Sequence, residues 1–232
     1  MWSVVIEMQD VWKSYANGVM AVNGISVKIE RGEFIYVVGQ SGSGKSTFIK
    51  LMYREEKLTR GKILVDGTNI ADLKNKDIPL LRRKMGVVFQ DFKLLPKLTV
   101  YENVAFALEV IEESPRQIRK KVMQVLDLVK LKHRARFLPS ELSGGEQQRV
   151  SIARSIVNNP TVVVADEPTG NLDPENAWGI MEVFERINDS GTTVVMATHN
   201  KEIVNRIKKR VIAIESGMIV RDDKRGDFGY EG

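Results

Sequence analysis

The stretch Gly39–Ser46 reads Gly-Gln-Ser-Gly-Ser-Gly-Lys-Ser, and it decides the fold. It fits the phosphate-binding pattern G-x-x-x-x-G-K-[ST] without a mismatch. The apolar run Phe34–Val38 precedes it and has no polar alternation, which predicts a strand covered on both faces. The segment Phe48–Met52 follows as a predicted helix. A strand, a glycine-rich loop and a helix in this order form the context in which such a loop binds phosphate.

The chemistry of phosphate binding explains the residue types of this loop. Glycines lack a Cβ, so the backbone can bring its N–H groups against phosphate oxygens, and the helix N-terminus adds a partial positive charge. Lys45 is expected to contact the β- and γ-phosphates, and the Ser46 hydroxyl to contact Mg²⁺. A dinucleotide site is disfavoured because no G-x-G-x-x-G occurs here. The predicted nucleotide-binding residues are Gly39, Gln40, Ser41, Gly42, Ser43, Gly44, Lys45, Ser46 and Thr47.

A second apolar run, Val162–Ala165, ends in two carboxylates, Asp166 and Glu167. An aspartate at the carboxyl end of a strand can hold Mg²⁺ beside Ser46, and Asp166 is given that role. Glu167, one residue further on, is expected to polarise the attacking water. The alternative is an ordinary acidic turn before Pro168, which the upstream phosphate loop disfavours.

Apolar runs of four to six residues alternate with helical patterns along the chain, which predicts an α/β protein. The helix Pro115–Lys130 is expected to be capped by Ser114, with Gln117 completing a capping box. Further helices are expected from Glu146 to Asn158 and from Pro174 to Gly191. The predicted strands are Val4–Met8, Phe34–Val38, Lys62–Val65, Met85–Phe89, Val162–Ala165, Thr193–Ala197 and Val211–Ile214.

Composition sets the wider limits. The chain has 232 residues, of which 43% are hydrophobic, enough for a real core, and it contains no cysteine, which excludes a disulfide scaffold and a thiolate metal site. No apolar run reaches the roughly 18 residues of a membrane helix, and charged residues near the N-terminus argue against a signal peptide. The net charge of +5 leaves nucleic acid or an acidic membrane surface open, but scattered solvated lysines and arginines explain it better.

The segment Leu142–Val150, Leu-Ser-Gly-Gly-Glu-Gln-Gln-Arg-Val, resembles the signature sequence of the ABC-type ATPases. Glu146 stands where that family more often has glutamine. The resemblance implies that Ser143, Gly144, Gly145 and Glu146 form a second anion-binding nest, used in trans by a partner copy. It also implies a homodimer that forms on ATP binding, head to tail, and encloses two ATP molecules with Mg²⁺.

Other positions match the same family one by one. The resemblance implies that Tyr15 stacks on adenine, that Gln90 touches Mg²⁺ and senses a membrane partner, and that His199 contacts the γ-phosphate. Asn171–Asp173 resembles the loop that crosses the dimer interface. For Tyr15 the alternative is an ordinary core aromatic residue, and for His199 a satisfied buried histidine.

The resemblance also implies an arrangement of the chain. A single ABC ATPase domain is expected over residues 1–221, with a P-loop NTPase core, a mostly parallel sheet and an N-terminal antiparallel β subdomain. The core with its β subdomain would take about residues 1–90 and 156–221, and the inserted helical subdomain about 91–155. Residues 222–232 are polar and glycine-rich and are expected to form a flexible tail.

Within the family, Asp166–Asp173 resembles the branch that serves lipoprotein release, macrolide export and cell division. The segments 89–95 and 99–111 look closest to its cell-division members. This implies a peripheral ATPase subunit at the cytoplasmic face of the membrane, which acts with an FtsX-like integral membrane protein and relays motion to peptidoglycan hydrolases.

Two alternatives remain at this point. One is the ATPase of an exporter from the same branch, and the other is a soluble ABC protein acting on nucleic acid. No nucleic acid is expected, because the gap between Ser46 and Ser143 is too short for long coiled coils and shows no heptads. Phe92, Leu94, Leu95 and Tyr101 are candidates for the docking groove, or else they pack inside the helical lobe.

Overall fold

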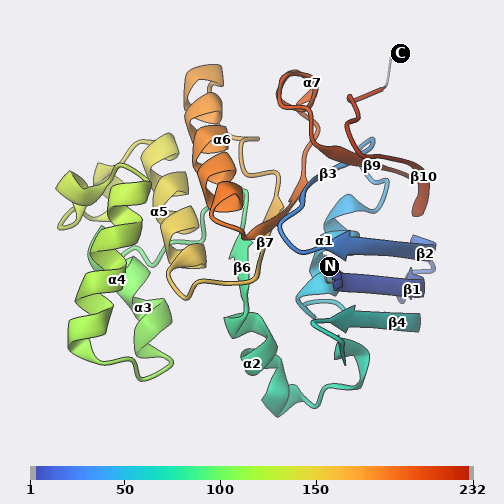
Figure 1. Ribbon diagram of the computed structural model, residues 1–232, viewed down its shortest axis with the longest axis horizontal. Helices are drawn as coiled ribbons and strands as arrows, with labels where there is room; N and C mark the ends of the chain where they lie inside the picture. Colours follow the sequence, from blue (N-terminus) through green and yellow to red (C-terminus); the bar gives the residue numbers. More distant parts are fainter. Residues whose placement is uncertain (1–3, 230–232) are drawn as a thin grey trace.

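The structure, a computed structural model, describes residues 4–229. Its elements alternate between strands and helices as an α/β protein requires (Figure 1). The strands are β1 Val4–Ser14, β2 Met20–Glu30, β3 Phe34–Val38, β4 Arg60–Val65, β5 Thr68–Asn69, β6 Met85–Val88, β7 Val162–Asp166, β8 Thr193–Ala197, β9 Arg210–Glu215 and β10 Met218–Asp223. The α-helices are α1 Lys45–Met52, α2 Ile78–Arg83, α3 Val100–Glu109, α4 Pro115–Leu128, α5 Gly144–Ile156, α6 Pro174–Asp189 and α7 Lys201–Arg206. Short 3-10 turns cover Ile70–Asp72, Asn75–Asp77, Lys132–Arg134 and Pro139–Glu141.

The central sheet has the strand order β10-β9-β3-β8-β7-β6. Its five strands from β9 to β6 are parallel, and β10 pairs antiparallel with β9. Every side chain of β3 and of the apolar part of β7, Val162–Ala165, is buried, as their unbroken apolar sequences predicted, and β8 is buried as well. Because the strands are parallel, the carboxyl ends of β3, β6, β7 and β8 meet at one edge, where loops gather functional side chains.

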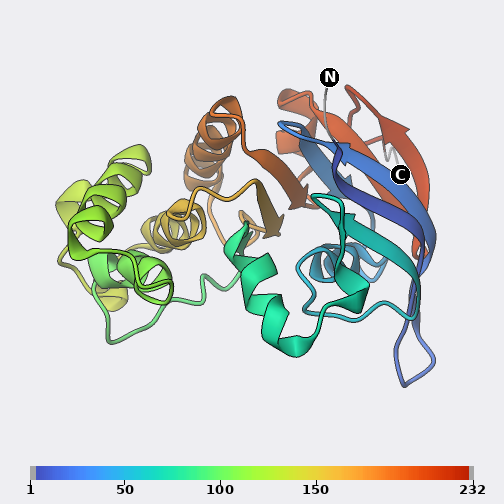
Figure 2. The same ribbon diagram turned by 60° about the horizontal axis from the view of Figure 1, so that its bottom comes forward.

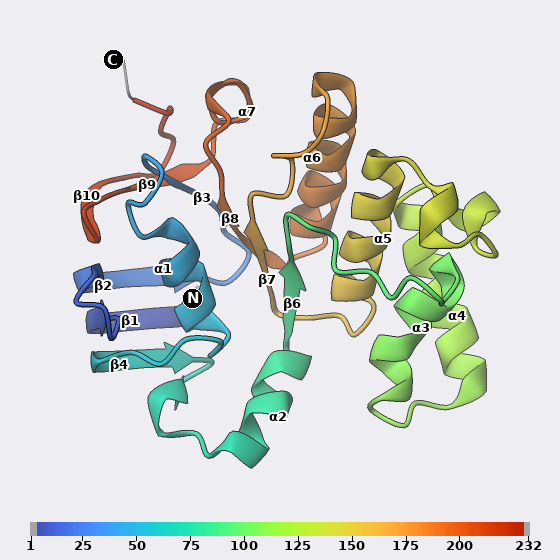
Figure 3. The same ribbon diagram turned by 180° about the vertical axis from the view of Figure 1, so that it is seen from behind.

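The N-terminal strands form a separate antiparallel sheet with the order β2-β1-β4-β5. Helix α1 contacts β2 of this sheet and also β7 and β8 of the central sheet, so it packs between the two sheets. Figure 3 shows α1 beside β1, β2 and β4. The expected strand Val4–Met8 extends to Ser14, and β2 and β10 were not predicted. Register shifts in the β1–β2 pairing explain why no simple alternation marks this hairpin.

Helices α3, α4 and α5 gather on the side of the central strands opposite the antiparallel sheet (Figures 1 and 2). Their buried faces join the same apolar cluster as strand residues Val88 and Val163, so the helices and the sheet share a core. Within residues 4–229, no helix combines the length and the apolar character needed to cross a bilayer.

Two local expectations were wrong. Ser114 makes no side-chain capping hydrogen bond, and its backbone N–H is bonded at 3.2 Å to the Glu113 carboxylate, in the place expected for Gln117. The flexible tail does not begin at Asp222, because Asp222 and Asp223 belong to β10 and Phe228 is buried. The last part of that expected tail, residues 230–232, lies outside the described residues.

Candidate nucleotide-binding and hydrolysis site

The glycine-rich loop joins the buried end of β3 to α1, and close backbone packing fixes its shape. At Gly39 (φ 152°) an added Cβ would lie 2.2 Å from the Ile214 carbonyl oxygen. At Gly44 (φ 109°) it would lie 2.2 Å from the carbonyl oxygen of Ala21. Both contacts are with backbone, so any side chain here would displace β9 or β2. The loop conformation is therefore set by neighbours as well as by its own sequence.

Lys45 is buried at the start of α1, and its ammonium donates hydrogen bonds to the carbonyl oxygens of Gly39 and Gln40, each 2.9 Å away. The side chain thus folds back over the loop, and its charge lies at the loop's centre. Among its neighbours, Ser43 is buried and its carbonyl accepts the N–H of Gly217. The loop brings together a cation and a helix N-terminus, both of which favour a phosphate group.

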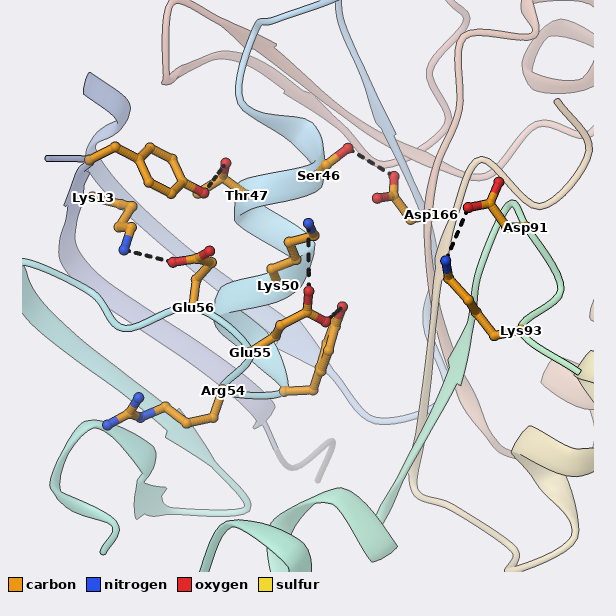
Figure 4. Close-up of polar contacts among 12 residues, drawn as sticks. Lys13, Ser46, Thr47, Lys50, Arg54, Glu55, Glu56, Asp91, Lys93 and Asp166 are labelled. Carbon is orange, nitrogen blue, oxygen red and sulfur yellow. Dashed lines mark hydrogen bonds and ion pairs between the residues drawn. The ribbon is translucent and has the colours of Figure 1, made fainter. Parts of the chain in front are cut away.

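Ser46 and Asp166 meet although 120 residues separate them. The Ser46 hydroxyl donates a hydrogen bond of 3.1 Å to Oδ1 of Asp166, which ends strand β7 (Figure 4). Burial raises the pKa of Asp166, the Ser46 hydrogen bond opposes this rise, and the Glu167 carboxylate adds to it. A buried carboxylate whose charged form is disfavoured is suited to bind a cation. The hydroxyl and carboxylate oxygens also match the ligand preference of Mg²⁺.

Glu167 and His199 form the second pair. The Glu167 Oε2 atom lies 2.8 Å from Nδ1 of His199 and accepts the His199 backbone N–H at 3.3 Å. Glu167 has a φ of 49°, a conformation rare for a residue with a side chain. Its backbone N–H is bonded to Ala197 of the neighbouring strand, which fixes this turn.

Gln90 lies after β6 and is tied to the loop before α6. Its amide Nε2 donates to Oδ1 of Asn171 at 3.2 Å, and Nδ2 of Asn171 donates back to the Gln90 carbonyl at 3.4 Å. The expected metal and membrane-sensing residue is therefore linked to the expected interface loop. This link joins two segments that are 81 residues apart in the sequence.

Most of these groups line one cleft of about 690 Å³ at the carboxyl edge of the central sheet; Asp166 is not among its described lining residues and meets it through the hydrogen bond to Ser46. The structure thus brings together the predicted loop, Gln90, Glu167 and His199. Its lining also contains two residues that the sequence did not single out, Lys201 and Phe228. The cleft is lined by Gly39, Gln40, Ser41, Gly42, Lys45, Ser46, Gln90, Glu167, His199, Lys201 and Phe228.

Tyr15 lies beside this loop rather than in the core. Its hydroxyl is 3.2 Å from Oγ1 of Thr47, and the Lys13 ammonium lies 4.6 Å from the centre of its ring. Lys13 is in turn held by Glu56 at 2.8 Å (Figure 4). The ring is only partly buried, so the position suits a flat aromatic platform next to the phosphate loop.

The signature residues occupy a different place. Ser143 caps α5 through a reciprocal capping box with Glu146: its hydroxyl accepts the Glu146 N–H at 3.3 Å, and the Glu146 carboxylate accepts the Ser143 N–H at 2.9 Å. This backbone hydrogen bond is the main reason that the pKa of Glu146 is lowered. Among the described residues that line the cleft, none is Ser143, Gly144, Gly145 or Glu146.

Sequence reasoning did not single out two residues of α5 that hold the surrounding loops. Gln148 is buried, and its Nε2 donates to the carbonyls of Phe89 at 3.3 Å and Pro168 at 2.7 Å. Arg154 donates to the carbonyls of Phe92 and Lys93. In the sequence, Gln148 and Arg154 are recognisable only as polar residues on a helix that otherwise packs inward. This pattern does not indicate which loop carbonyls they bind.

Comparisons with known proteins agree with this geometry. A family model described as ABC transporter matches residues 22–170. A solved structure titled "Dimeric Structure of MJ0796, a Bacterial ABC Transporter Cassette" superimposes with a TM-score of 0.86 at 36% identity, covering 95% of this chain and 99% of the other. The chain belongs to the ABC transporter family.

Sequence relatives indicate which members of this family the chain resembles. The chain is 70% identical over 225 residues to the cell division ATP-binding protein FtsE of Bacillus subtilis, covering 97% of this chain and 99% of the relative. It is 43% identical over 227 residues to the FtsE of Escherichia coli, covering 98% and 100%. A related structure, a post-hydrolysis state of MJ0796 bound to ADP and phosphate, matches with a TM-score of 0.86 at 35% identity and covers 95% of this chain and 99% of that one.

Proposed function

We propose that this chain is the ATP-hydrolysing subunit of a cell-division complex, in which two copies close on two ATP molecules and drive a membrane partner. Full-length relatedness to cell-division ATPases supports the biological role. The single observation that carries the chemistry is the cleft that places the loop Gly39–Ser46 opposite the Glu167–His199 pair.

In this mechanism the loop binds the triphosphate through backbone N–H groups and Lys45. Glu167 orients and polarises the attacking water, and His199 holds the Glu167 carboxylate and contacts the terminal phosphate. Tyr15 stacks on the adenine ring next to Thr47. Gln90 reports nucleotide occupancy to Asn171 and the segment beyond it.

Mg²⁺ fits the donor set at the loop. Ser46 and Asp166 supply oxygens that already lie together, and Gln90, whose amide carries a further oxygen, lines the cleft with Ser46. When bound, the ion would neutralise charge that develops on the phosphates. Asp166 holds its carboxylate at the end of β7, where burial favours pairing with a cation.

The proposed dimer rests on the placement of the signature. Ser143–Glu146 provides capped N–H groups at the start of α5 but does not line the cleft of its own chain. Each nucleotide would therefore need the signature of the other copy.

Because the chain has no cysteine, cysteines introduced at Ser41 and Ser143 form a clean test. We expect disulfides between separate chains when ATP and Mg²⁺ are present. Bonds only within one chain, or none, would refute the arrangement.

The proposed membrane partner is an FtsX-like integral membrane protein, with this chain peripheral at the cytoplasmic face. The helical segment about 91–155 would transmit closure to it, as the inserted subdomain of a single ATPase domain. Leu94 and Tyr101 pack against the core, whereas Leu95 and Phe106 are exposed and remain available for docking. Peptidoglycan hydrolases would receive the motion across the membrane.

Affinity capture from solubilised membranes, followed by identification of the retained membrane protein, tests this assignment. An FtsX-like protein supports the proposal, and recovery of an exporter subunit replaces it with the exporter function. A salt series with DNA checks the remaining alternative, because phosphate contacts give a steep salt dependence. We expect no specific DNA binding.

A further inference from the structure

The C-terminal segment 224–229, here called the C-terminal strap, is held against the body of the protein by several contacts. The Gly226 N–H is bonded to the Lys209 carbonyl at 3.1 Å. The Arg221 guanidinium donates to the carbonyls of Asp227 at 2.7 Å and Phe228 at 3.0 Å. These bonds come from β10 and from Lys209, the residue before β9, so the strap is docked along its length.

Phe228 is the anchor of the strap. Its side chain is only 6% exposed, and its N–H is bonded to Oδ1 of Asn205 in α7 at 2.8 Å. The same residue lines the nucleotide cleft together with Lys201. The strap therefore supplies part of the cleft wall, although its sequence is polar and glycine-rich.

Lys201 begins α7 two residues after His199 and lines the cleft with His199 and Glu167. Its ammonium lies 5.6 Å from the centre of the Phe228 ring, within the range of a cation–π interaction. The aromatic ring thus holds a second cation in the cleft, besides Lys45. Two cations in one cleft attract a ligand with several negative charges, such as a nucleoside triphosphate.

The geometry points to the following assignment, which rests on the proposed function. We propose that the C-terminal strap completes the nucleotide cleft and that Lys201, positioned by Phe228, is a second phosphate-binding cation for the terminal phosphate. ATP carries a γ-phosphate that ADP lacks. Lys201 therefore favours ATP over ADP, whereas Lys45 holds both nucleotides.

Nucleotide binding to the purified full-length chain tests Lys201. With fluorescent MANT-ATP and MANT-ADP and Mg²⁺, we expect Lys201→Gln to weaken ATP binding about fivefold, the effect of one charge pair at about 4 Å in water, and ADP binding less than twofold. Lys201→Arg should restore the preference. Lys224→Gln, which removes the same charge from an exposed position on the strap, is the matched control and should bind as the wild type.

Equal loss of both nucleotides, or no loss at all, in Lys201→Gln would overturn the proposal. Failure of the wild type to bind either nucleotide would instead refute the proposed function itself. A variant that lowers the ratio of ATP to ADP affinity without changing the thermal midpoint supports a role in binding rather than in folding.

The strap is tested through the ring that holds Lys201. Phe228→Tyr keeps an aromatic face and should keep the ATP preference. Phe228→Leu keeps the apolar volume without the π system, so the logarithm of the ratio of ATP to ADP affinity should fall by about half. Retention of the full preference in Phe228→Leu would overturn the positioning role. The Phe228→Tyr variant guards against a result that comes only from misfolding.

Discussion

The phosphate loop and the signature contain similar ingredients but lie in opposite environments. Both place serine and glycine at a helix N-terminus, which favours an anion. The loop Gly39–Ser46 lies inside a cleft, with a buried lysine and two backbone contacts that forbid a Cβ. The signature Ser143–Glu146 has an exposed capping serine, and it is not among the described residues that line the nucleotide cleft of its own chain.

This difference indicates which of the two segments can act within a single chain. Lys45 of the loop, the Ser46–Asp166 hydrogen bond and the neighbouring Glu167–His199 pair all come from one chain, so we expect a single copy to bind a nucleotide. The signature has only dipoles and N–H groups, and these gain strength when water is excluded. Substitutions in the phosphate loop should therefore weaken nucleotide binding by the monomer. Substitutions in the signature should affect only the activity of the dimer.

The largest effect is expected from Glu167→Gln. The amide cannot accept a proton from water, so ATP hydrolysis should fall at least about 100-fold, while binding is kept because the loop is unchanged. A steady-state phosphate-release assay measures the loss, and size-exclusion chromatography with ATP and Mg²⁺ should show a trapped dimer. Wild-type turnover in this variant would remove Glu167 from its role.

Lys45→Ala should give the next largest effect, on the monomer itself. It removes the buried cation from the loop and leaves only backbone dipoles there, with Lys201 acting on the terminal phosphate alone, so nucleotide affinity should fall about 100-fold. Titration calorimetry at a concentration that keeps the chain monomeric measures this loss. Normal ATP affinity would show that the two nests differ less than the geometry indicates.

The role of the signature is tested by two substitutions of Ser143 that keep the helix cap. Aspartate and asparagine cap helices about as well as serine, so Ser143→Asp and Ser143→Asn preserve α5. The added carboxylate should repel the partner's phosphates and slow hydrolysis about tenfold, with monomer affinity unchanged within about twofold. Ser143→Asn, the uncharged control, should lose less. Reduced monomer affinity in Ser143→Asp would contradict the division of roles.

Much of the central site was predictable because its signals are local. The strand before Gly39 and the strand ending at Asp166 are unbroken apolar runs, and their polar endings fall at one edge of a parallel sheet. Their meeting, seen in the Ser46–Asp166 hydrogen bond, follows from that topology. The expected roles of Tyr15, Gln90 and His199 came from resemblance alone, and they stay predictions.

What the sequence did not reveal depends on contacts between distant segments. Strand β2 interrupts its apolar alternation, since Asn23 and Gly24 fall in a hairpin with shifted register. Phe228 is a single apolar residue in the strap, and its burial depends on the apolar cluster that it joins and on Asn205 and Arg221, which hold its backbone. Gln148 likewise acquires its role from two loop carbonyls that no spacing in its own helix indicates.

The smallest predicted effect is a change in thermal stability on substitution of Asp166, the residue proposed to hold Mg²⁺. Its pKa is raised above the ordinary 3.8 chiefly by burial, so the folded state disfavours the ionised carboxylate. The stability that Asp166 contributes is complete below its unfolded pKa and is lost as the pH rises through the folded pKa. Asp166→Asn mimics the protonated form, so without Mg²⁺ its thermal midpoint at pH 7 should exceed that of the wild type, by about 2–4 °C for each kcal/mol relieved. The two curves should converge near pH 4, measured by calorimetry in EDTA, while hydrolysis with Mg²⁺ is lost. A variant less stable than the wild type at pH 7 would show that the Ser46 hydrogen bond outweighs burial.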